Sequence, residues 1–184
     1  MSLSLSTAAV CFIACHAGPA DHFSTFSQEL VQKGYKVQIY AAGPALKKLQ
    51  DREIKEVISF SLDNSSEEEV AIEIAKKCAN AAVVITDVGH PFDITLQKVL
   101  ASYAPKTVRL AYYDNPEPYV PGGYSAVAVK VMQAAEKILC ANAKLAVAPI
   151  YQEPSLEIDL PFEKRIGLGY YPVSQGEKIA KRRS

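Results

Sequence analysis

The stretch Ala9 to His22 reads AVCFIACHAGPADH, and the rest of the fold can be worked out from it. Its first half is a continuous apolar run of strand length, which is typical of a strand buried on both faces of a parallel sheet. A turn with Gly18 and Pro19 follows, and helical spacing of apolar residues begins at Phe23. A buried strand that passes through a glycine turn into a helix is where α/β proteins bind ligands. The stretch therefore predicts an α/β fold with a ligand site just beyond the first strand.

Strand-like and helix-like patterns then alternate along the chain to about residue 150. Further apolar runs of strand length occupy residues 36–41, 57–61, 82–87, 108–112 and 138–141. Helical patterns lie between them, over residues 45–49, 65–79, 94–100 and 124–135. Such alternation with short connections is typical of a parallel sheet with right-handed crossovers. We expect a doubly wound, mostly parallel, Rossmann-like sheet of about six strands, with helices on both faces, over residues 1–150.

Residues 151–184 lose this alternation. The segment contains Pro154, Pro161, Gly167 and Gly169, and these residue types interrupt regular structure. We expect a loop-rich C-terminal extension that packs on the domain or leads out of it.

Two local signals mark the ends of helices. Lys33-Gly34 follows the first helical pattern, and glycine just beyond a helix readily takes the left-handed conformation that ends it. Ser65 and Ser66 each stand three residues before a glutamate, Glu68 and Glu69, which is the spacing of a capping box at a helix start. The first helix should therefore end near residue 33, and another should start within Ser65–Glu69.

The composition is that of a globular protein. Of 184 residues, 49% are hydrophobic and 22% are charged, which is enough apolar material for one buried core. Basic and acidic residues balance at 20 each, so no bulk field attracts nucleic acid. No run reaches the roughly 18 apolar residues that a membrane span needs. We expect neither a nucleic-acid partner nor a membrane span.

The cysteines indicate a reducing compartment. Cys11, Cys15, Cys78 and Cys140 lie in apolar contexts and form no C-x-x-C pair. Buried thiols of this kind behave as small hydrophobic residues, and the first residues lack the basic region of a secretory signal. We expect a cytoplasmic protein.

Polar residues and glycines gather just beyond the ends of the predicted strands. Ligands of an open parallel sheet bind at the carboxyl ends of its strands, so these positions form the candidate site. All three histidines of the chain are among them. Together with one tyrosine of a later loop, the residues assigned to substrate binding are His16, Gly18, Asp21, Gly43, His90, Asp114 and Tyr124.

Common cofactor and nucleophile motifs are missing from the sequence. The first loop does not match G-x-G-x-x-G, and the chain has neither G-x-x-x-x-G-K-[ST] nor G-x-S-x-G. This argues against dinucleotide binding, a P-loop nucleotidase and a serine hydrolase of the usual α/β type. The histidines and aspartates also lack compact ligand spacing. We expect no cofactor and no metal.

The sharpest catalytic candidate is a pair formed by His22 and Asp87. A histidine can deprotonate a hydroxyl because its pKa lies near working pH, and an aspartate beside it would fix its tautomer. The first and fourth strands are commonly neighbours in a doubly wound sheet, so their loops could meet. The alternative is structural: His22 caps or packs against the helix, and Asp87 is an ordinary hydrogen-bonding residue at a strand end.

A second feature is the tyrosine- and proline-rich segment Tyr112–Tyr124, which reads YYDNPEPYVPGGY. Tyrosine rings offer stacking faces with a polar tip, which suits sugars and other polar rings. A lid over a site or an interface patch is an equally good interpretation.

The order of these patterns resembles the N-terminal domain of GT-B glycosyltransferases. Four segments carry the resemblance: Val10–His22, Leu30–Val37, Val83–Asp87 and Ala135–Ala141. The first is similar to the family's glycine-containing loop that ends in Gly-His, and the second to its Arg/Lys-Gly-His turn. The third resembles the strand whose aspartate pairs with the catalytic histidine, and the fourth the late strand entered through Ala-Asp.

The resemblance implies an acceptor-binding domain of an enzyme that transfers a sugar from a nucleotide-sugar donor to a hydroxyl acceptor. His22 would be the base and Asp87 its orienting partner. The loop around Gly18 and the segment Tyr112–Tyr124 would hold the acceptor. One departure is Asp21, which stands where the family has glycine.

The length is a second departure, because the family holds its donor mainly in a second, C-terminal domain. We therefore expect a donor-binding domain outside these 184 residues, or a homo-oligomer, and an inactive isolated chain. Two alternatives stay open. One is a stand-alone Rossmann-like or flavodoxin-like module that binds a nucleotide or metabolite without catalysis. The other is a different enzyme on the same fold, such as half of a sugar-nucleotide epimerase.

Overall fold

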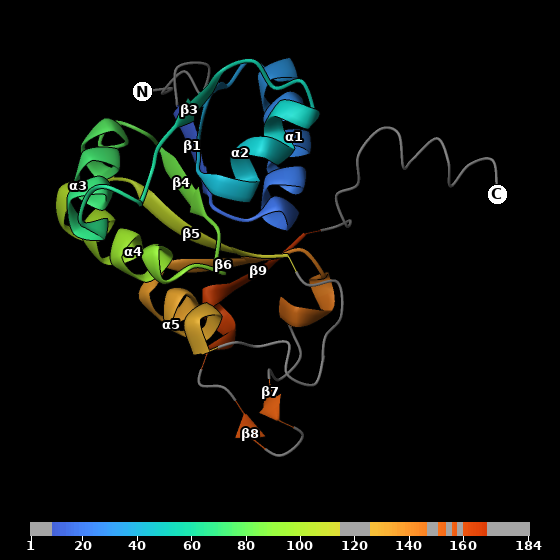
Figure 1. Ribbon diagram of the computed structural model, residues 1–184. Helices are drawn as coiled ribbons and strands as arrows, with labels where there is room; N and C mark the ends of the chain where they lie inside the picture. Colours follow the sequence, from blue (N-terminus) through green and yellow to red (C-terminus); the bar gives the residue numbers. More distant parts are fainter. Residues whose placement is uncertain (1–8, 115–125, 147–150, 154–155, 158–159, 169–184) are drawn as a thin grey trace, which may run out of the picture.

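A seven-stranded, all-parallel sheet forms the centre of the molecule in the computed structural model (Figure 1). The structure describes residues 9–114, 126–146, 151–153, 156–157 and 160–168. The strand order is β3-β2-β1-β4-β5-β6-β9. The strands are β1 (Ala9–Ala14), β2 (Lys36–Ala41), β3 (Val57–Ser59), β4 (Val83–Thr86), β5 (Val108–Tyr113), β6 (Lys137–Cys140) and β9 (Arg165–Gly167). The predicted Rossmann-like α/β class is confirmed.

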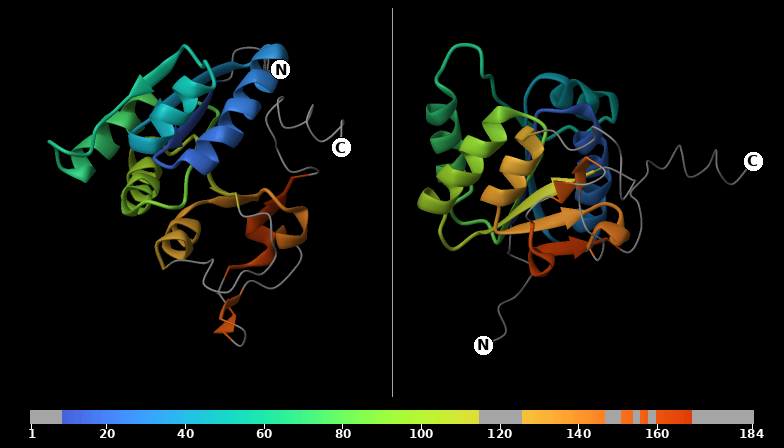
Figure 2. Two further views of the ribbon diagram at one scale, coloured as in Figure 1. Left: turned by 45° about the vertical axis from the view of Figure 1, so that its right-hand side comes forward. Right: turned by 90° about the horizontal axis from the view of Figure 1, so that it is seen from below.

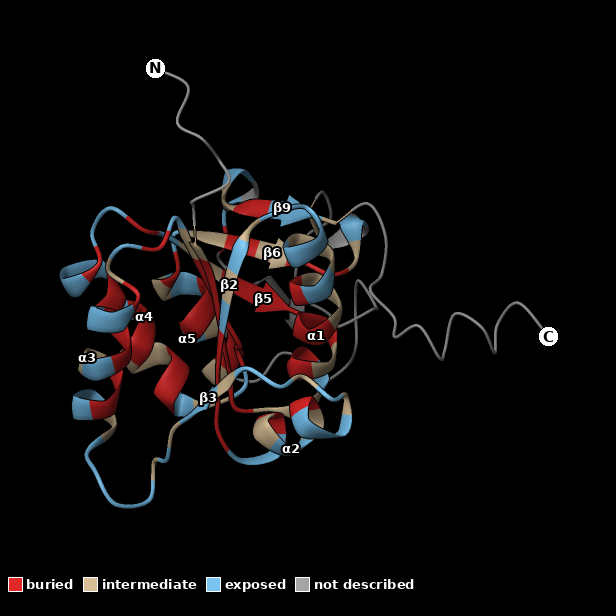
Figure 3. Ribbon diagram, turned by 90° about the horizontal axis from the view of Figure 1, so that it is seen from above, coloured by how far each residue is buried: buried red, intermediate tan, exposed pale blue. Residues whose placement is uncertain are grey.

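Helices cover both faces of the sheet, as Figure 3 shows from above. α1 (Ala17–Gln32) and α2 (Gly43–Asp51) lie on one face, and α3 (Glu67–Lys77), α4 (Pro91–Tyr103) and α5 (Ala126–Ala134) lie on the other. The chain runs from β1 outward to β3, then returns past β1 to β4 and continues in the opposite direction. Because parallel crossovers are right-handed, this reversal puts the later helices on the opposite face. The reversal also opens a crevice at the carboxyl ends of β1 and β4, where ligands bind in such sheets.

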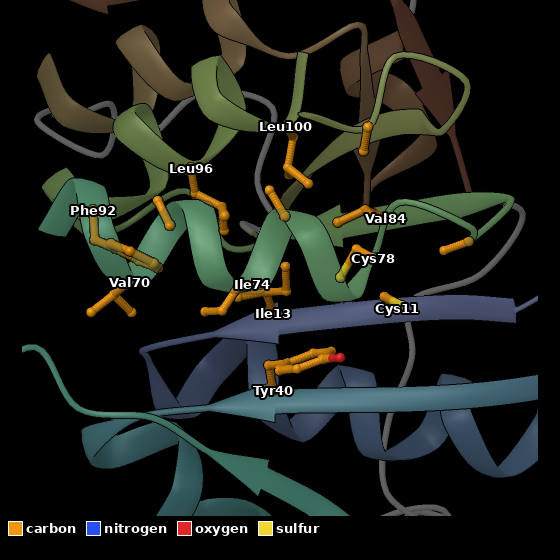
Figure 4. Packing of buried hydrophobic residues seen from close by; sticks show 14 of the residues in the cluster. Cys11, Ile13, Tyr40, Val70, Ile74, Cys78, Val84, Phe92, Leu96 and Leu100 are labelled. Atoms are coloured by element: carbon orange, nitrogen blue, oxygen red, sulfur yellow. The ribbon is translucent and has the colours of Figure 1, made fainter. Parts of the chain in front are cut away.

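Apolar side chains fill the space between the sheet and each helix layer. On the α3 and α4 side, residues such as Ile13, Ile74 and Leu96 are buried together (Figure 4). On the α1 side, Phe12 packs against Phe23, with ring centroids 4.9 Å apart. Burial of both faces explains why the central strands are continuous apolar runs without alternation.

The predicted helix ends are confirmed. Gly34 has φ +88°, and the N–H of Tyr35 donates to the carbonyl of Leu30, so α1 ends in a left-handed glycine cap. Ser66 Oγ accepts the N–H of Glu69, and the Glu69 carboxylate accepts the N–H of Ser66, which completes the capping box of α3.

The sheet contains one strand more than the six that the sequence predicts. β9 comes from the segment expected to be a loop-rich extension, and it pairs in parallel with β6 at the sheet edge (Figure 2). Arg165–Gly167 has one apolar residue between an arginine and a glycine and so forms no apolar run, which is why only the pairing reveals this strand. The segment also holds the short antiparallel pair β7 (Tyr151–Glu153) and β8 (Leu156–Glu157). In the chain, one 3-10 turn, η2 (Ala143–Ala146), precedes this pair and another, η3 (Phe162–Lys164), follows it.

Candidate functional site

The end of β1 delivers His16 to the crevice. β1 ends at Ala14 and α1 begins at Ala17, so His16 is the N-cap residue of the helix, and its backbone is extended. Its side chain makes no capping hydrogen bond. The imidazole instead lies against the end of β4, with Nδ1 2.8 Å from Oδ2 of Asp87.

Asp87 ties the ends of β1 and β4 together, and it is 1% exposed. Besides the imidazole, its Oδ2 accepts the backbone N–H groups of His16 at 2.9 Å and Cys15 at 3.3 Å. Its Oδ1 accepts those of Val88 at 2.6 Å and Gly89 at 3.1 Å. All four backbone partners are donors, so the carboxylate acts as an acceptor and the shared proton belongs to Nδ1 of His16.

This arrangement fixes the chemistry of His16. With the proton on Nδ1, the neutral ring carries its lone pair on Nε2, which is the form of a general base. The hydrogen bond to Asp87 raises the pKa of His16, while burial opposes the rise. The side chain is 43% exposed, so a substrate can reach the ring. His16, predicted as a substrate-binding residue, has the geometry of a base oriented by a carboxylate.

The expected pairing of His22 with Asp87 is wrong. His22 is 7% exposed, and its Nδ1 lies 2.6 Å from the hydroxyl oxygen of Tyr112 on β5. The two rings meet edge to face, 5.6 Å between centroids. The physical reason is that α1 starts at Ala17, six residues before Phe23, so that His22 lies within the helix and on its buried face. The structural alternative for His22, packing within the helix layer, describes its contacts.

Asp114 follows β5 and completes the polar cluster. A Cβ atom on Gly18 would lie 2.8 Å from Asp114 Oδ2, so the glycine allows the carboxyl group to approach the first loop. Burial raises the pKa of Asp114, the negative charge of Asp87 raises it further, and the positive charge of His16 lowers it. The three predicted residues His16, Gly18 and Asp114 therefore meet beside Asp87.

Gly89 was not among the predicted binding residues, yet it shapes this cluster. A Cβ atom at this position would lie 2.7 Å from Nδ1 and 2.8 Å from Cε1 of His16. No real Cβ contact is that close, so any larger residue would push the ring away from Asp87. The signal available in the sequence was the glycine two residues after the aspartate at a strand end.

A cavity of about 220 Å³ lies beside His90 and beside Cys15, the residue before His16. It lies between the ends of β1, β2 and β3 and the start of α4, and its walls include the predicted residues Gly43 and His90. The imidazoles of His16 and His90 are 6.1 Å apart between ring centroids. Cys15, Ala42 and Pro44 also line it, and the rest of the wall, residues 60–63, follows β3 and carries no motif that predicts a site.

Of the remaining predicted binding residues, Asp21 does not join the cluster. Oδ1 of Asp21 lies 2.6 Å from Nε of Arg52, an ion pair between α1 and the end of α2. Tyr124, with residues 115–125 of the tyrosine-rich loop, lies outside the described residues. The proposed roles of that loop therefore stay predictions.

Three further observations concern the described residues only. All four cysteines are buried free thiols. No group of three or more histidines, cysteines, aspartates and glutamates in these ranges is placed to hold a metal ion. In the same part of the chain, every helix is too short or too polar to cross a membrane.

Several solved structures have the same architecture. MurG from Acinetobacter baumannii matches with a TM-score of 0.59 and 14% identity, over 92% of this chain and 47% of its own. A glycosyltransferase from Rickettsia africae ESF-5 matches with a TM-score of 0.54 and 13% identity, over 88% and 42% of the two chains. The chain shares the Rossmann-like α/β fold of these two structures. The resemblance seen in the sequence is thus confirmed at the level of the fold.

A third neighbour, described as a UDP-N-acetylglucosamine 2-epimerase from Listeria monocytogenes, has a TM-score of 0.56 and 10% identity. It matches over 76% of this chain and 40% of its own. The chain therefore spans less than half the length of each of these three proteins. No protein-family model matches the sequence, and no curated protein matches it.

Proposed function

We propose that the chain is the acceptor-binding part of a sugar-transfer enzyme, with His16 as the base and Asp87 as the residue that orients it. The observation that carries this is the 2.8 Å contact between His16 Nδ1 and Asp87 Oδ2, which leaves Nε2 of a partly exposed imidazole as a proton acceptor. The site lies in the crevice where open parallel sheets bind ligands. The role that the sequence suggested for His22 passes to His16.

In the proposed reaction, Nε2 of His16 takes the proton from an acceptor hydroxyl as that oxygen attacks the anomeric carbon of the donor sugar. The bond between the anomeric carbon and the phosphate oxygen breaks, and the nucleoside diphosphate leaves with the electron pair. The imidazolium formed in this step is stabilised by Asp87, whose carboxylate is held in place by four backbone N–H groups.

The donor site belongs to the same proposal. In each solved neighbour, more than half of the chain lies outside the part that matches this protein. We propose that a donor-binding domain outside these 184 residues, or a partner chain, supplies the nucleotide-sugar across the crevice.

The test is transfer by the protein encoded by the whole gene, with UDP-sugars as donors and hydroxyl-bearing acceptors. His16→Ala should lower turnover by a factor of about 10² to 10⁴ while leaving the thermal unfolding temperature nearly unchanged. Unchanged turnover in this variant would exclude the assigned role.

A second candidate is a binding module without catalysis, which the cavity of about 220 Å³ in the crevice favours. Calorimetric titration with UDP-sugars, NAD, FMN and S-adenosylmethionine separates the two. Tight binding of a redox or methyl cofactor would contradict sugar transfer.

A further inference from the structure

His90 presents a hydrogen-bond donor whose direction is set by its own helix. It is the N-cap residue of α4, and its Nδ1 accepts the backbone N–H of Phe92 at 3.1 Å. A backbone N–H can only donate, so Nδ1 of the neutral ring must be unprotonated and Nε2 must carry the proton. The second half of the capping box, from the His90 N–H to Oδ2 of Asp93 at 2.9 Å, holds the residue in this position.

His16 and His90 therefore have opposite tautomers. His16 carries its proton on Nδ1 and offers a lone pair at Nε2, whereas His90 offers a proton at Nε2. Their ring centroids are 6.1 Å apart, so one bound molecule can contact both. The pair consists of one acceptor and one donor on neighbouring strand ends.

The cavity beside His90 is suited to a small neutral ring. Its volume of about 220 Å³ is below the ~300–1,000 Å³ usual for drug-sized ligands. Its walls combine the ring of Phe60 with the polar side chains of Ser61 and Asp63. No lysine or arginine is among the described residues that line it, so a phosphate or carboxylate would find no cationic side chain there.

The charges around the cavity floor also disfavour an anion. Cys15 lines the cavity, and burial raises the pKa of its thiol, with a further upward contribution from the negative charge of Asp87. The carboxylate of Asp87 would repel an anionic ligand group. A hydroxyl group meets no such penalty.

We propose that His90 is a substrate-positioning residue, whose Nε2–H donates to a hydroxyl or ring oxygen of a neutral, hydroxyl-bearing ring seated in the cavity between β1, β2, β3 and α4. This ring belongs to the acceptor, so the inference rests on the proposed sugar-transfer function. His90 would hold the acceptor while His16, 6.1 Å away, takes the proton of the reacting hydroxyl.

Two substitutions separate the donor from the cap. His90→Asn keeps an N-cap acceptor for the Phe92 N–H but removes the Nε2 donor, because asparagine is a good N-cap residue and is too short to reach into the cavity. His90→Gln places an amide donor near the former Nε2 position. Thermal unfolding of both variants checks that the helix start is intact.

The first measurement needs no ligand. Two-bond ¹H–¹⁵N spectra of the imidazoles should show His90 protonated at Nε2 and His16 protonated at Nδ1. A His90 ring protonated at Nδ1 overturns the proposal.

The second measurement titrates the labelled protein with methyl β-D-glucopyranoside and, separately, with glucose 1-phosphate. The glucoside should shift the His90 resonances, the phosphate should bind more weakly, and His90→Asn should weaken glucoside binding about tenfold, the usual effect of one lost hydrogen bond. His90→Gln should recover part of that loss. No glucoside binding to the wild type, or equal binding by His90→Asn, overturns the proposal.

The two proposals fail in different ways. His16→Ala should still bind the glucoside at His90 while losing transfer. If His16→Ala transfers sugar normally, the proposed function fails whatever the binding result. If His90→Asn binds like the wild type while transfer still depends on His16, only the role of His90 fails.

Discussion

The carboxylate of Asp87 holds the imidazole of His16 at 2.8 Å, although 71 residues separate the two in the chain. The neighbouring histidine of the same helix, His22, points into the core and meets Tyr112 instead. The different partners of the two histidines follow from their positions, because His16 precedes α1 as its N-cap residue whereas His22 lies on the buried face of the helix.

We predict that His16→Ala and His22→Ala separate activity from stability. Loss of a general base typically costs a factor of about 10² to 10⁴ in rate, so His16→Ala should lose transfer by this factor with little change in unfolding free energy. His22→Ala removes a buried ring and its bond to Tyr112, and should cost about 2 kcal/mol of stability while most transfer activity remains. Kinetics and urea unfolding measure both. The reverse outcome would restore His22 as the base.

The pH dependence of the rate should report the contact with Asp87. An ordinary histidine has a pKa of about 6.5. The hydrogen bond to Asp87 raises the pKa of His16, so this base loses its proton at a higher pH than an ordinary histidine does. The acidic limb of the rate profile should therefore lie above the ordinary value. In Asp87→Asn the pKa falls back, so the limb should move to lower pH while the maximal rate falls. A limb in the same place in both proteins would mean that another group titrates.

Gly89→Ala should impair the site without removing any functional group. The added Cβ would lie 2.7 Å from His16 Nδ1, so the ring must leave Asp87, and we expect a loss of transfer close to that of His16→Ala. The matched control is Gly34→Ala at the end of α1, where the space is open but φ is +88°. This control should cost about 1 kcal/mol of stability and leave the rate unchanged. Equal rates for Gly89→Ala and the wild type would show that transfer does not depend on the contact of the His16 ring with Asp87.

Asp93 should make stability fall as pH rises. Burial raises its pKa well above the ordinary value, Asp87 raises it further, and the bond from the His90 N–H opposes this. A raised folded-state pKa stabilises the fold below the unfolded pKa, near 3.9, and that contribution is lost as pH rises towards the folded value. Relative to Asp93→Asn, the wild type should lose up to about 1.4 kcal/mol per pH unit above pH 4. Urea unfolding at several pH values measures the difference, and parallel curves for the two proteins would contradict it.

The local patterns of this sequence determine most of its elements. Apolar runs place β1 and β4 because both faces of the central sheet are buried there, so few polar residues interrupt these strands. Gly34 and the Ser66–Glu69 capping box mark helix ends because their conformations and hydrogen bonds involve residues only a few positions apart. Such features need no knowledge of the rest of the chain.

The polar residues at the strand ends could also be predicted as a group, since parallel strands bring their carboxyl ends to one edge. Their pairing could not. The spacing of His22 and Phe26 on one helix face was a signal that His22 is buried, but the later helix start expected at Phe23 concealed it. The close approaches of Gly18 to Asp114 and of Gly89 to His16 join loops that are far apart in the chain.

The sequence by itself thus determined a doubly wound sheet with its polar residues at one edge. Only the tertiary structure decided that His16, rather than His22, meets Asp87, and that residues 165–167 add a seventh strand. The physical reason is range. Strand and helix patterns follow from the burial of neighbouring residues, whereas a contact across 71 residues depends on which strands lie side by side and on the turn at which a helix begins.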